Sequence, residues 1–340
     1  MKTGIVGGSG YAGGELIKLL SIHPNFEISY ICAGMNAGEE ITAIHPHLFS
    51  FAGQKFSQTD VSEINKCEIV FIALPHGESA KLISQIDQKV KVVDLGADFR
   101  LSSRESWEKY YGGEYAGKLP YGLPEIGDNS REIAAANKVA NPGCYATAIA
   151  LAAAPALASS LIDYEDIVAV AASGTTGAGR SAKVNLLGSE VMNSLSSYKF
   201  GGVHQHTPEI EETLSTIVGS QVRVSFTPIL APMPRGILAT VTAKLTKDCD
   251  TKEIHEIYSK YYLDGDFVEV LPLGTLPTTA SVNGTNKAAI AVAVDTHTNR
   301  LIISCAIDNL GKGAAGQAIQ NANLMCGFSQ GAGLWQIGVK

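Results

Sequence analysis

The fold is decided by residues 3–16, Thr3-Gly4-Ile5-Val6-Gly7-Gly8-Ser9-Gly10-Tyr11-Ala12-Gly13-Gly14-Glu15-Leu16. The apolar run at 3–7 predicts a β-strand, and residues 13–20 predict an amphipathic helix. Glycine lets the backbone turn tightly against a pyrophosphate, and the helix start offers free N–H groups and the positive end of its dipole. The loop between strand and helix fits G-x-G-x-x-G and therefore predicts a dinucleotide site at Gly7, Gly8, Ser9, Gly10, Tyr11, Ala12 and Gly13. The alternative is a glycine-rich turn that only packs helix on sheet.

The strand–helix rhythm continues through the first 143 residues. Further strands are predicted at Glu27–Ala33, Glu68–Leu74 and Val90–Leu95, and a further helix at Glu78–Ile86. Apolar strands that alternate with helices are typical of a doubly wound parallel sheet. We therefore expect residues 1–143 to form a Rossmann-type dinucleotide-binding domain.

The pattern changes near residue 144. Strands are now predicted at Asp166–Ala172, Val222–Pro228, Gly236–Leu245, Phe267–Leu271, Ala288–Asp295 and Arg300–Ile307. Helices are predicted at Pro208–Val218, Thr251–Tyr262 and Gly311–Cys326. Because some strands follow one another directly, a mixed or antiparallel sheet is expected. Residues 144–310 should form a second α/β domain for catalysis, substrate binding and oligomerisation, with a helix at about 311–330 packing back on the first.

Composition excludes several classes of protein. The 340 residues carry a formal net charge of −7, with 45% hydrophobic and 17% charged residues. An acidic chain is a poor partner for nucleic acid or anionic lipid, and no apolar stretch is long enough to span a membrane. The N-terminus leads directly into a strand without a signal-peptide pattern, so we expect a cytoplasmic protein with free thiols. The six cysteines form no C-x-x-C pair, which argues against a zinc knuckle.

The end of the second predicted strand bears on the choice of cofactor. An NAD enzyme usually carries a carboxylate there, which binds the ribose 2′-hydroxyl. This chain has Ile31-Cys32-Ala33-Gly34 instead. The missing carboxylate removes a repulsion against a 2′-phosphate and favours NADP(H), although no Arg or Lys stands at this position to bind that phosphate.

Cys144 is the candidate nucleophile. It lies in Asn141-Pro142-Gly143-Cys144-Tyr145-Ala146-Thr147, directly before the helix formers of residues 148–154. At a helix start the dipole and free N–H groups stabilise a thiolate, so its pKa is expected to be lowered. A thiolate together with a nicotinamide cofactor points to hydride transfer to an acyl group bound through sulfur. The alternative is a buried structural cysteine.

Taken together, these motifs resemble the N-acetyl-γ-glutamyl-phosphate reductases over essentially the whole chain. Besides the glycine loop, the resemblance rests on Ala73–Gly77, Asp94–Leu101, Tyr121–Glu125, Asn141–Thr147, Ser173–Arg180, His204–Ile210, Pro232–Gly236 and Asp308–Gln317. It implies a Rossmann domain and a second α/β domain like that of semialdehyde and glyceraldehyde-phosphate dehydrogenases. It also implies NADPH-dependent reduction of N-acetylglutamyl 5-phosphate to the 5-semialdehyde, with release of phosphate, in arginine biosynthesis. Two places depart from the family: Gln205, where arginine is common, and Ala33-Gly34-Met35, where basic or hydroxyl residues are common.

The resemblance implies Cys144 as nucleophile, and a nearby imidazole is suited to hold and return its proton. His206 is preferred over His204 because it directly precedes a predicted helix start, and Glu209 could orient it. One alternative is a helix cap with two surface histidines. A zinc site is a weaker rival, because a third clear ligand is missing.

Two arginines and an asparagine are the candidates for the substrate. Arg100 is assigned to the phosphate, against the alternative of a surface salt bridge with Asp98 or Glu105. Arg235 is assigned to the substrate carboxylate, and Asn141 to the substrate beside the nucleophile.

Residues beside the nicotinamide are predicted as well. Ser173 and Gly174 begin a loop of small residues that allows a close approach of the ring, or forms an ordinary tight turn. Asn309 could bind the carboxamide, and Pro75 could pack beside the nucleotide. Arg180 is expected to act locally or at an interface.

Two other functions compete with this one. One is the same chemistry on aspartyl phosphate or a carrier-linked aminoadipyl phosphate, and the other is a redox sensor that binds NADP without turnover. No metal is expected. The partners expected are the acyl phosphate or semialdehyde, phosphate, and further copies of the chain in a dimer or tetramer, because a long antiparallel sheet leaves a face that needs cover.

Overall fold

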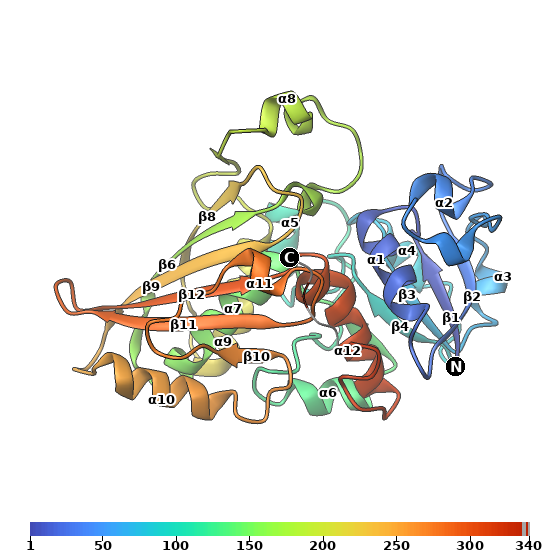
Figure 1. The fold of residues 1–340 in the computed structure, drawn as a ribbon. Coiled ribbons are helices and arrows are strands. Elements are labelled where there is room, and N and C mark those ends of the chain that lie inside the picture. The colour runs from blue at the N-terminus through green and yellow to red at the C-terminus, as the bar shows by residue number, and fades with distance from the viewer. Residues whose placement is uncertain (335–337, 339–340) are drawn as a thin grey trace.

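In the computed structural model, residues 1–334 and 338 are described, and they build two sheets (Figure 1). The first sheet is parallel throughout, in the order β2-β1-β3-β4-β5. Its strands are β1 (Lys2–Val6), β2 (Glu27–Cys32), β3 (Ile69–Ile72), β4 (Lys91–Asp94) and β5 (Lys138–Ala140). The helical segments of this half are α1 (Tyr11–Leu20), α2 (Ile41–Ile44), η1 (Phe49–Phe51), α3 (Val61–Ile64), α4 (Ser79–Ile83), α5 (Arg104–Tyr110) and α6 (Asn129–Ala135).

The strand order of the first sheet positions a binding crevice. From β1 the chain moves to β2 on one side and then to β3 on the other. Loops that leave the carboxyl ends of β1 and β3 therefore separate, and ligands bind at such a switch point. The glycine loop follows β1, Pro75 follows β3, and Cys144 follows β5, so all three lie at the same edge. The predicted doubly wound parallel sheet is confirmed.

The second sheet has seven strands in the order β10-β11-β12-β9-β6-β8-β7. They are β6 (Ile162–Ser173), β7 (Ser196–Ser197), β8 (Val224–Leu230), β9 (Ile237–Leu245), β10 (Val268–Val270), β11 (Ala288–Asp295) and β12 (Arg300–Ile307). The pairs β6–β8 and β10–β11 are parallel and the others antiparallel, which confirms a mixed sheet. The helical segments are α7 (Cys144–Ala158), η2 (Thr175–Ala178), η3 (Val184–Leu186), α8 (Gly188–Val191), α9 (His206–Val218), α10 (Thr251–Tyr261), α11 (Thr279–Val282), the π-helical η4 (Gly311–Ala315) and α12 (Gly316–Met325).

Helix α7 fills the core behind the second sheet (Figure 1). Every residue from Tyr145 to Leu157 is buried, and the helix packs against β6, β9 and β12 on one side and α9 and α10 on the other. Its many alanines allow this close approach from all directions, because they add little bulk and favour the helix. The first residue of this immobile helix is Cys144, so the core fixes the position of the nucleophile.

The other face of the second sheet is largely uncovered. Residues that point away from α7 are exposed or half-buried, for example Val168 and Val170 on β6 and Thr240 on β9. Residues 180–195 leave the sheet as a protruding arm that carries α8, and the chain rejoins the sheet at β7 (Figure 1). The sequence predicted no element in this arm, because it lacks a clear period.

The end of the chain returns to the first sheet. Helix α12 packs against α6, α1 and β4, and Ala318, Ile319 and Ala322 join the apolar core around β1. The single helix predicted at Gly311–Cys326 is instead a π-helical turn followed by α12, and glycines in that turn meet other backbone closely. Among the described residues, no helix combines the length and apolar character needed to cross a bilayer.

Candidate active site

The glycine loop is shaped by close backbone contacts. Gly7 has a φ of +80°, and the N–H groups of Gly7 and Gly8 donate to the carbonyl of Cys32 at 3.1 and 2.9 Å. A Cβ on Gly13 would lie 2.7 Å from the Cα of Gly8. Any side chain at these positions would push α1 away from β1. The close approach of the start of α1 to β1 is the arrangement that suits a dinucleotide pyrophosphate.

His45 forms a hydrogen bond with this loop, a role that the sequence did not reveal. Its Nε2 lies 2.8 Å from the carbonyl oxygen of Gly8, and a Cβ on Gly14 would lie only 2.5 Å from its Cε1. Burial lowers the pKa of His45, which favours a neutral ring that donates this hydrogen bond. No spacing in the sequence links residue 45 to the loop, so only the fold could identify it.

Arg180 reaches the same loop from the other half of the chain. Its guanidinium lies 5.8 Å from the ring centre of Tyr11, the first residue of α1. The exposed Pro75 lies at the neighbouring strand end, where the carbonyl of Ala73 lies close to Gly7. The glycine loop is therefore flanked by Arg180 at Tyr11 and by the end of β3 at Gly7.

Cys144 is the first residue of α7, as predicted, with Gly143 as its N-cap. The side chain is half-buried, and a Cβ on Gly313 would lie 2.7 Å from its Cβ. The expectation of a lowered pKa is wrong for the ligand-free site. Burial raises the pKa of the Cys144 thiol to about 11, although the N–H of Tyr145 and the charge of Arg100 act in the opposite direction. The helix start alone does not offset the loss of solvent.

His206 lies against the residue before the nucleophile. Its Nε2 is directly next to the position that a Cβ on Gly143 would take, so only glycine fits there. Its Nδ1 is buried and has no hydrogen-bond partner among the described residues. Burial and the charges of Arg100 and Lys199 lower the pKa of His206 to about 3, so the ring is neutral and can accept a proton.

His204 is buried in an aromatic cluster behind His206. Its Nδ1 accepts a hydrogen bond from the backbone N–H of His206 at 3.1 Å, and its ring contacts Tyr145, Tyr198 and Phe226. Burial lowers the pKa of His204 to about 2. His204 thus accepts the first N–H of α9 from one residue before the N-cap, Gln205, and the two histidines are not both at the surface as the alternative required.

Glu209 does not orient His206, contrary to the prediction. Its Oε1 accepts hydrogen bonds from the N–H of Gly143 at 2.7 Å and the hydroxyl of Tyr121 at 2.9 Å. Its Oε2 lies 3.3 Å from Nη1 of Arg100. The carboxylate therefore fixes the loop that leads into Cys144.

The other polar candidates also have partners within the protein. Arg100 is buried rather than forming the alternative surface salt bridge, and it donates to the carbonyls of Asn141 and Leu95, both at 2.8 Å, besides Glu209. The amide of Asn141 donates to the carbonyl of Ala314 and accepts from Asn321. The side chain of Asn141 thus ties the loop to the end of the chain and does not face the site.

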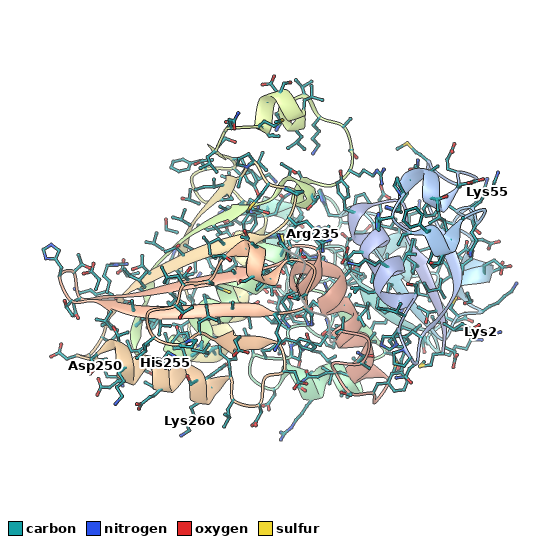
Figure 2. The ribbon with its side chains drawn as sticks, in the orientation of Figure 1. Lys2, Lys55, Arg235, Asp250, His255 and Lys260 are labelled. Atoms are coloured by element: carbon teal, nitrogen blue, oxygen red, sulfur yellow. The ribbon has the colours of Figure 1, made fainter. Side chains whose placement is uncertain are left out.

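Arg235 lies where the two halves of the chain meet (Figure 2). Its Nη1 is 2.8 Å from Oε2 of Glu15, and its Nε donates to Oδ1 of Asp308 at 3.1 Å. Nη2 lies 2.7 Å from Oδ2 of Asp308, though without the angle of a hydrogen bond. Two carboxylates thus already neutralise the arginine that was assigned to the substrate carboxylate.

The loop of small residues that begins at Ser173 and Gly174 is held by hydrogen bonds of Asn309. Asn309 donates to the hydroxyl of Thr176 at 2.9 Å and accepts from the N–H of Gly236 at 2.8 Å, so both ends of its amide are engaged by the chain. A Cβ on Gly174 would lie 2.7 Å from the N of Arg235, and Ser173 beside it is buried. The loop therefore packs as a tight turn, and Asn309 supports it rather than extending into the crevice.

Comparison with known proteins matches this arrangement. The family model described as semialdehyde dehydrogenase, NAD binding domain, matches residues 2–136, and the one described as semialdehyde dehydrogenase, dimerisation domain, matches residues 144–309. The chain is 50% identical over 338 residues to an N-acetyl-gamma-glutamyl-phosphate reductase of Acidothermus cellulolyticus, covering 99% of this chain and 98% of that one. It is also 50% identical to one of Frankia casuarinae, covering 100% and 99%.

Solved structures with the same fold include aspartate semialdehyde dehydrogenases. One from Candida albicans, with NADP, has a TM-score of 0.72 at 16% identity and covers 96% of this chain and 98% of its own. Another from Vibrio cholerae has a TM-score of 0.71 at 16% identity, with the same coverage. At this identity the likeness concerns the fold alone.

Proposed function

Because the chain belongs to the N-acetyl-gamma-glutamyl-phosphate reductase family of semialdehyde dehydrogenases, we propose that Cys144 is the nucleophile of that reaction. The activity is that of an N-acetyl-gamma-glutamyl-phosphate reductase, an oxidoreductase of arginine biosynthesis. The observation that carries the proposal is the position of Cys144 at the start of a buried helix, with His206 against the preceding Gly143 and the glycine loop at the same sheet edge. The alternative acyl phosphates and the non-catalytic sensor have no such support from the relatives.

The thiol proton of Cys144 moves to the neutral His206 as the sulfur attacks the acyl carbon of the substrate. The N–H groups at the start of α7 stabilise the oxyanion. The carbon–oxygen bond to phosphate breaks, its electrons leave with the phosphate, and the proton on His206 passes to that phosphate. A thioester on Cys144 remains.

The second half of the reaction releases the aldehyde. When bound, the reduced nicotinamide cofactor would supply the hydride that converts the thioester on Cys144 to a thiohemiacetal anion. As the carbon–sulfur bond breaks, His206 donates a proton taken up from solvent and Cys144 returns to the thiol. Glu209 keeps Gly143 in place throughout, so the nucleophile does not move with its loop.

The cofactor is an NAD(P)-type dinucleotide, and we propose NADP(H). The glycine loop and Pro75 would hold it, with Ser173 and Gly174 beside the nicotinamide. The support is the end of β2, where Ala33 and Gly34 offer no carboxylate to repel a 2′-phosphate. A KM for NADPH well below that for NADH would agree with this proposal, and the reverse order would overturn it.

The match to a dimerisation domain indicates a homo-oligomer. We propose that residues 1–143 bind the cofactor, residues 144–310 carry catalysis, and the uncovered face of the second sheet meets a second copy in a dimer or tetramer. Val170 and Thr240 lie on this face. Sedimentation of the purified protein as a monomer at micromolar concentration would contradict this proposal. The cytoplasmic location expected from the sequence stays a prediction.

The test of the catalytic proposal is the reverse reaction, in which absorbance at 340 nm reports NADPH formed from NADP⁺, the semialdehyde and phosphate. Cys144→Ala should abolish turnover while cofactor binding stays within about twofold, because the thioester cannot form. Cys249→Ala, which changes another half-buried cysteine, is the matched control and should keep wild-type rates. Near-normal turnover of Cys144→Ala would exclude the thioester mechanism.

A further inference from the structure

The substrate of this reaction carries a phosphate and a carboxylate, so its site needs positive charge. Both arginines that the sequence offered are already paired: Arg100 with Glu209, and Arg235 with Glu15 and Asp308. Each of these carboxylates would have to be displaced or would repel the substrate anion. A cation without a carboxylate partner would bind a substrate anion without this cost.

Lys199 lies in the segment that runs from the arm to the histidines. The segment is fixed at its start by β7, where Ser196 and Ser197 pair with β8. The next residue is Tyr198, whose hydroxyl donates a hydrogen bond to the hydroxyl of Tyr145 at 3.1 Å. Tyr145 directly follows the nucleophile Cys144 in the chain. Lys199 follows, and its Nζ donates to the side-chain oxygen of Gln205. Gln205 directly precedes His206, and the charge of Lys199 acts on the His206 ring, so the ammonium lies near the candidate base.

The charges around Lys199 favour the binding of an anion. Its positive charge contributes to lowering the pKa of both His204 and His206, so its field extends over the site. Among the residues that the structure describes, no carboxylate lies within ion-pair distance of Lys199 or of Lys183, which adds to the positive field. Two neighbouring cations without a carboxylate partner, one of which acts on both histidines, form an attractive field for a phosphorylated substrate.

The backbone at Lys199 supports a functional reading. Its φ is +43°, in the left-handed region that disfavours residues other than glycine. Gly201 and Gly202, which follow Phe200, also have positive φ. Strained backbone of this kind is kept where the surrounding structure needs a particular side chain at a particular place. Glycine at 199 would suit the conformation better, so the backbone alone does not account for a lysine at this position.

We propose that Lys199 binds the phosphate group of the acyl phosphate substrate, held toward the site by Gln205. The proposal rests on the proposed function. As the sulfur–carbon bond forms and the carbon–oxygen bond to phosphate breaks, the electron pair stays on the phosphate oxygen. The ammonium remains protonated and stabilises that charge, and it does not serve as an acid.

The experiment is the reverse reaction, with phosphate, semialdehyde and NADP⁺ varied in turn. Lys199→Gln should raise the KM for phosphate by about tenfold or more, because a charge-assisted hydrogen bond is lost. The KM values for semialdehyde and NADP⁺ should stay within about twofold, and Lys199→Arg should restore most of the phosphate affinity. Lys260→Gln, on the exposed face of α10 (Figure 2), is the matched control and should change none of them.

Two outcomes would overturn the proposal: an unchanged KM for phosphate, or a rise confined to the KM for semialdehyde, which would place the lysine on the carboxylate. If Lys199→Gln fails to fold, Lys199→Gly gives the same readout, because glycine fits the left-handed backbone. Failure of the proposed function would look different. In that case the wild-type protein itself would form no NADPH when phosphate is added.

Discussion

At the scale of single residues, the site combines a thiol and an imidazole that are both neutral without ligand. Burial raises the pKa of Cys144 and lowers that of His206, so neither carries its charge near pH 7. Such a pair differs from a preformed thiolate–imidazolium pair. The nucleophile is then activated only when the proton moves to His206 as the substrate is attacked.

This state of the thiol can be measured by alkylation. In the free enzyme, the rate at which iodoacetamide modifies Cys144 should rise steadily with pH up to about 10, because the thiolate fraction grows with pH below the raised pKa of about 11. Peptide mapping would follow Cys144 separately from the other cysteines. A plateau of the rate near pH 6 or 7 would mean that an ion pair is already formed.

The two histidines should respond differently to substitution. His206→Asn should lower kcat by about 10²- to 10⁴-fold, the usual loss for a general base, with little change in melting temperature. His204→Asn should lower the melting temperature and reduce kcat less than His206→Asn does, because His204 accepts the first N–H of α9 and is buried among aromatic rings. Steady-state rates and thermal melting of both variants would show which histidine is the base and which is structural. A larger kcat loss in His204→Asn would reverse the assignment.

At the scale of elements, strand ends carry the buried charges that shape the site. Asp94 ends β4, and its carboxylate accepts from the hydroxyl of Ser79 and the N–H of Gly96, both at 2.9 Å. Burial nevertheless raises its pKa to about 6, and the nearby Arg100 offsets only part of this. An acid whose pKa is higher in the folded state favours folding while it is protonated, and this contribution is lost as pH rises through that pKa.

Asp94→Asn should remove this pH dependence. Relative to the variant, the wild-type protein should lose about 2 kcal/mol of unfolding free energy between pH 4.5 and pH 8, given a folded pKa of about 6 against 3.8. Urea unfolding of both proteins at the two pH values gives the difference, and Asp87→Asn on the exposed surface serves as control. If the difference is the same at both pH values, Asp94 is ionised in the folded protein throughout this range.

At the scale of the whole molecule, buried polar contacts join segments that are far apart in the sequence. The Nζ of Lys312, in η4, is 2.5 Å from Oε1 of Glu125 and 2.7 Å from Oε1 of Gln320. Both charged side chains are buried, and burial lowers the pKa of Lys312. The pair connects the end of the chain to the loop before α6, so it holds the last helix on the first sheet.

Lys312→Met should therefore lower the unfolding free energy by about 3–5 kcal/mol, because Glu125 would remain as a buried charge without its partner. Lys66→Met, which breaks an exposed pair with Glu63, is the control and should have little effect. The double variant Lys312→Met, Glu125→Gln should recover part of the loss. Denaturant unfolding measures all three, and wild-type stability of Lys312→Met would contradict the expected coupling.

The sequence by itself determined the two sheets, the glycine loop and the helix that begins at Cys144. These features depend on local periods and on turn residues whose backbone requirement is visible in the chain, such as Gly7. Sequence reasoning was also sufficient for the family, because ordered motifs over the whole chain carry that information.

Only the tertiary structure decided the state of the charged and polar side chains. The sequence assigned Arg100, Asn141 and Arg235 to the substrate, but the fold brings each a partner from more than 30 positions away, such as Glu209 for Arg100. It also reversed the expected pKa shift of Cys144, because desolvation depends on everything packed around the helix start. Electrostatic interactions act through space and their strength depends on burial, so residue type and spacing along the chain do not fix them.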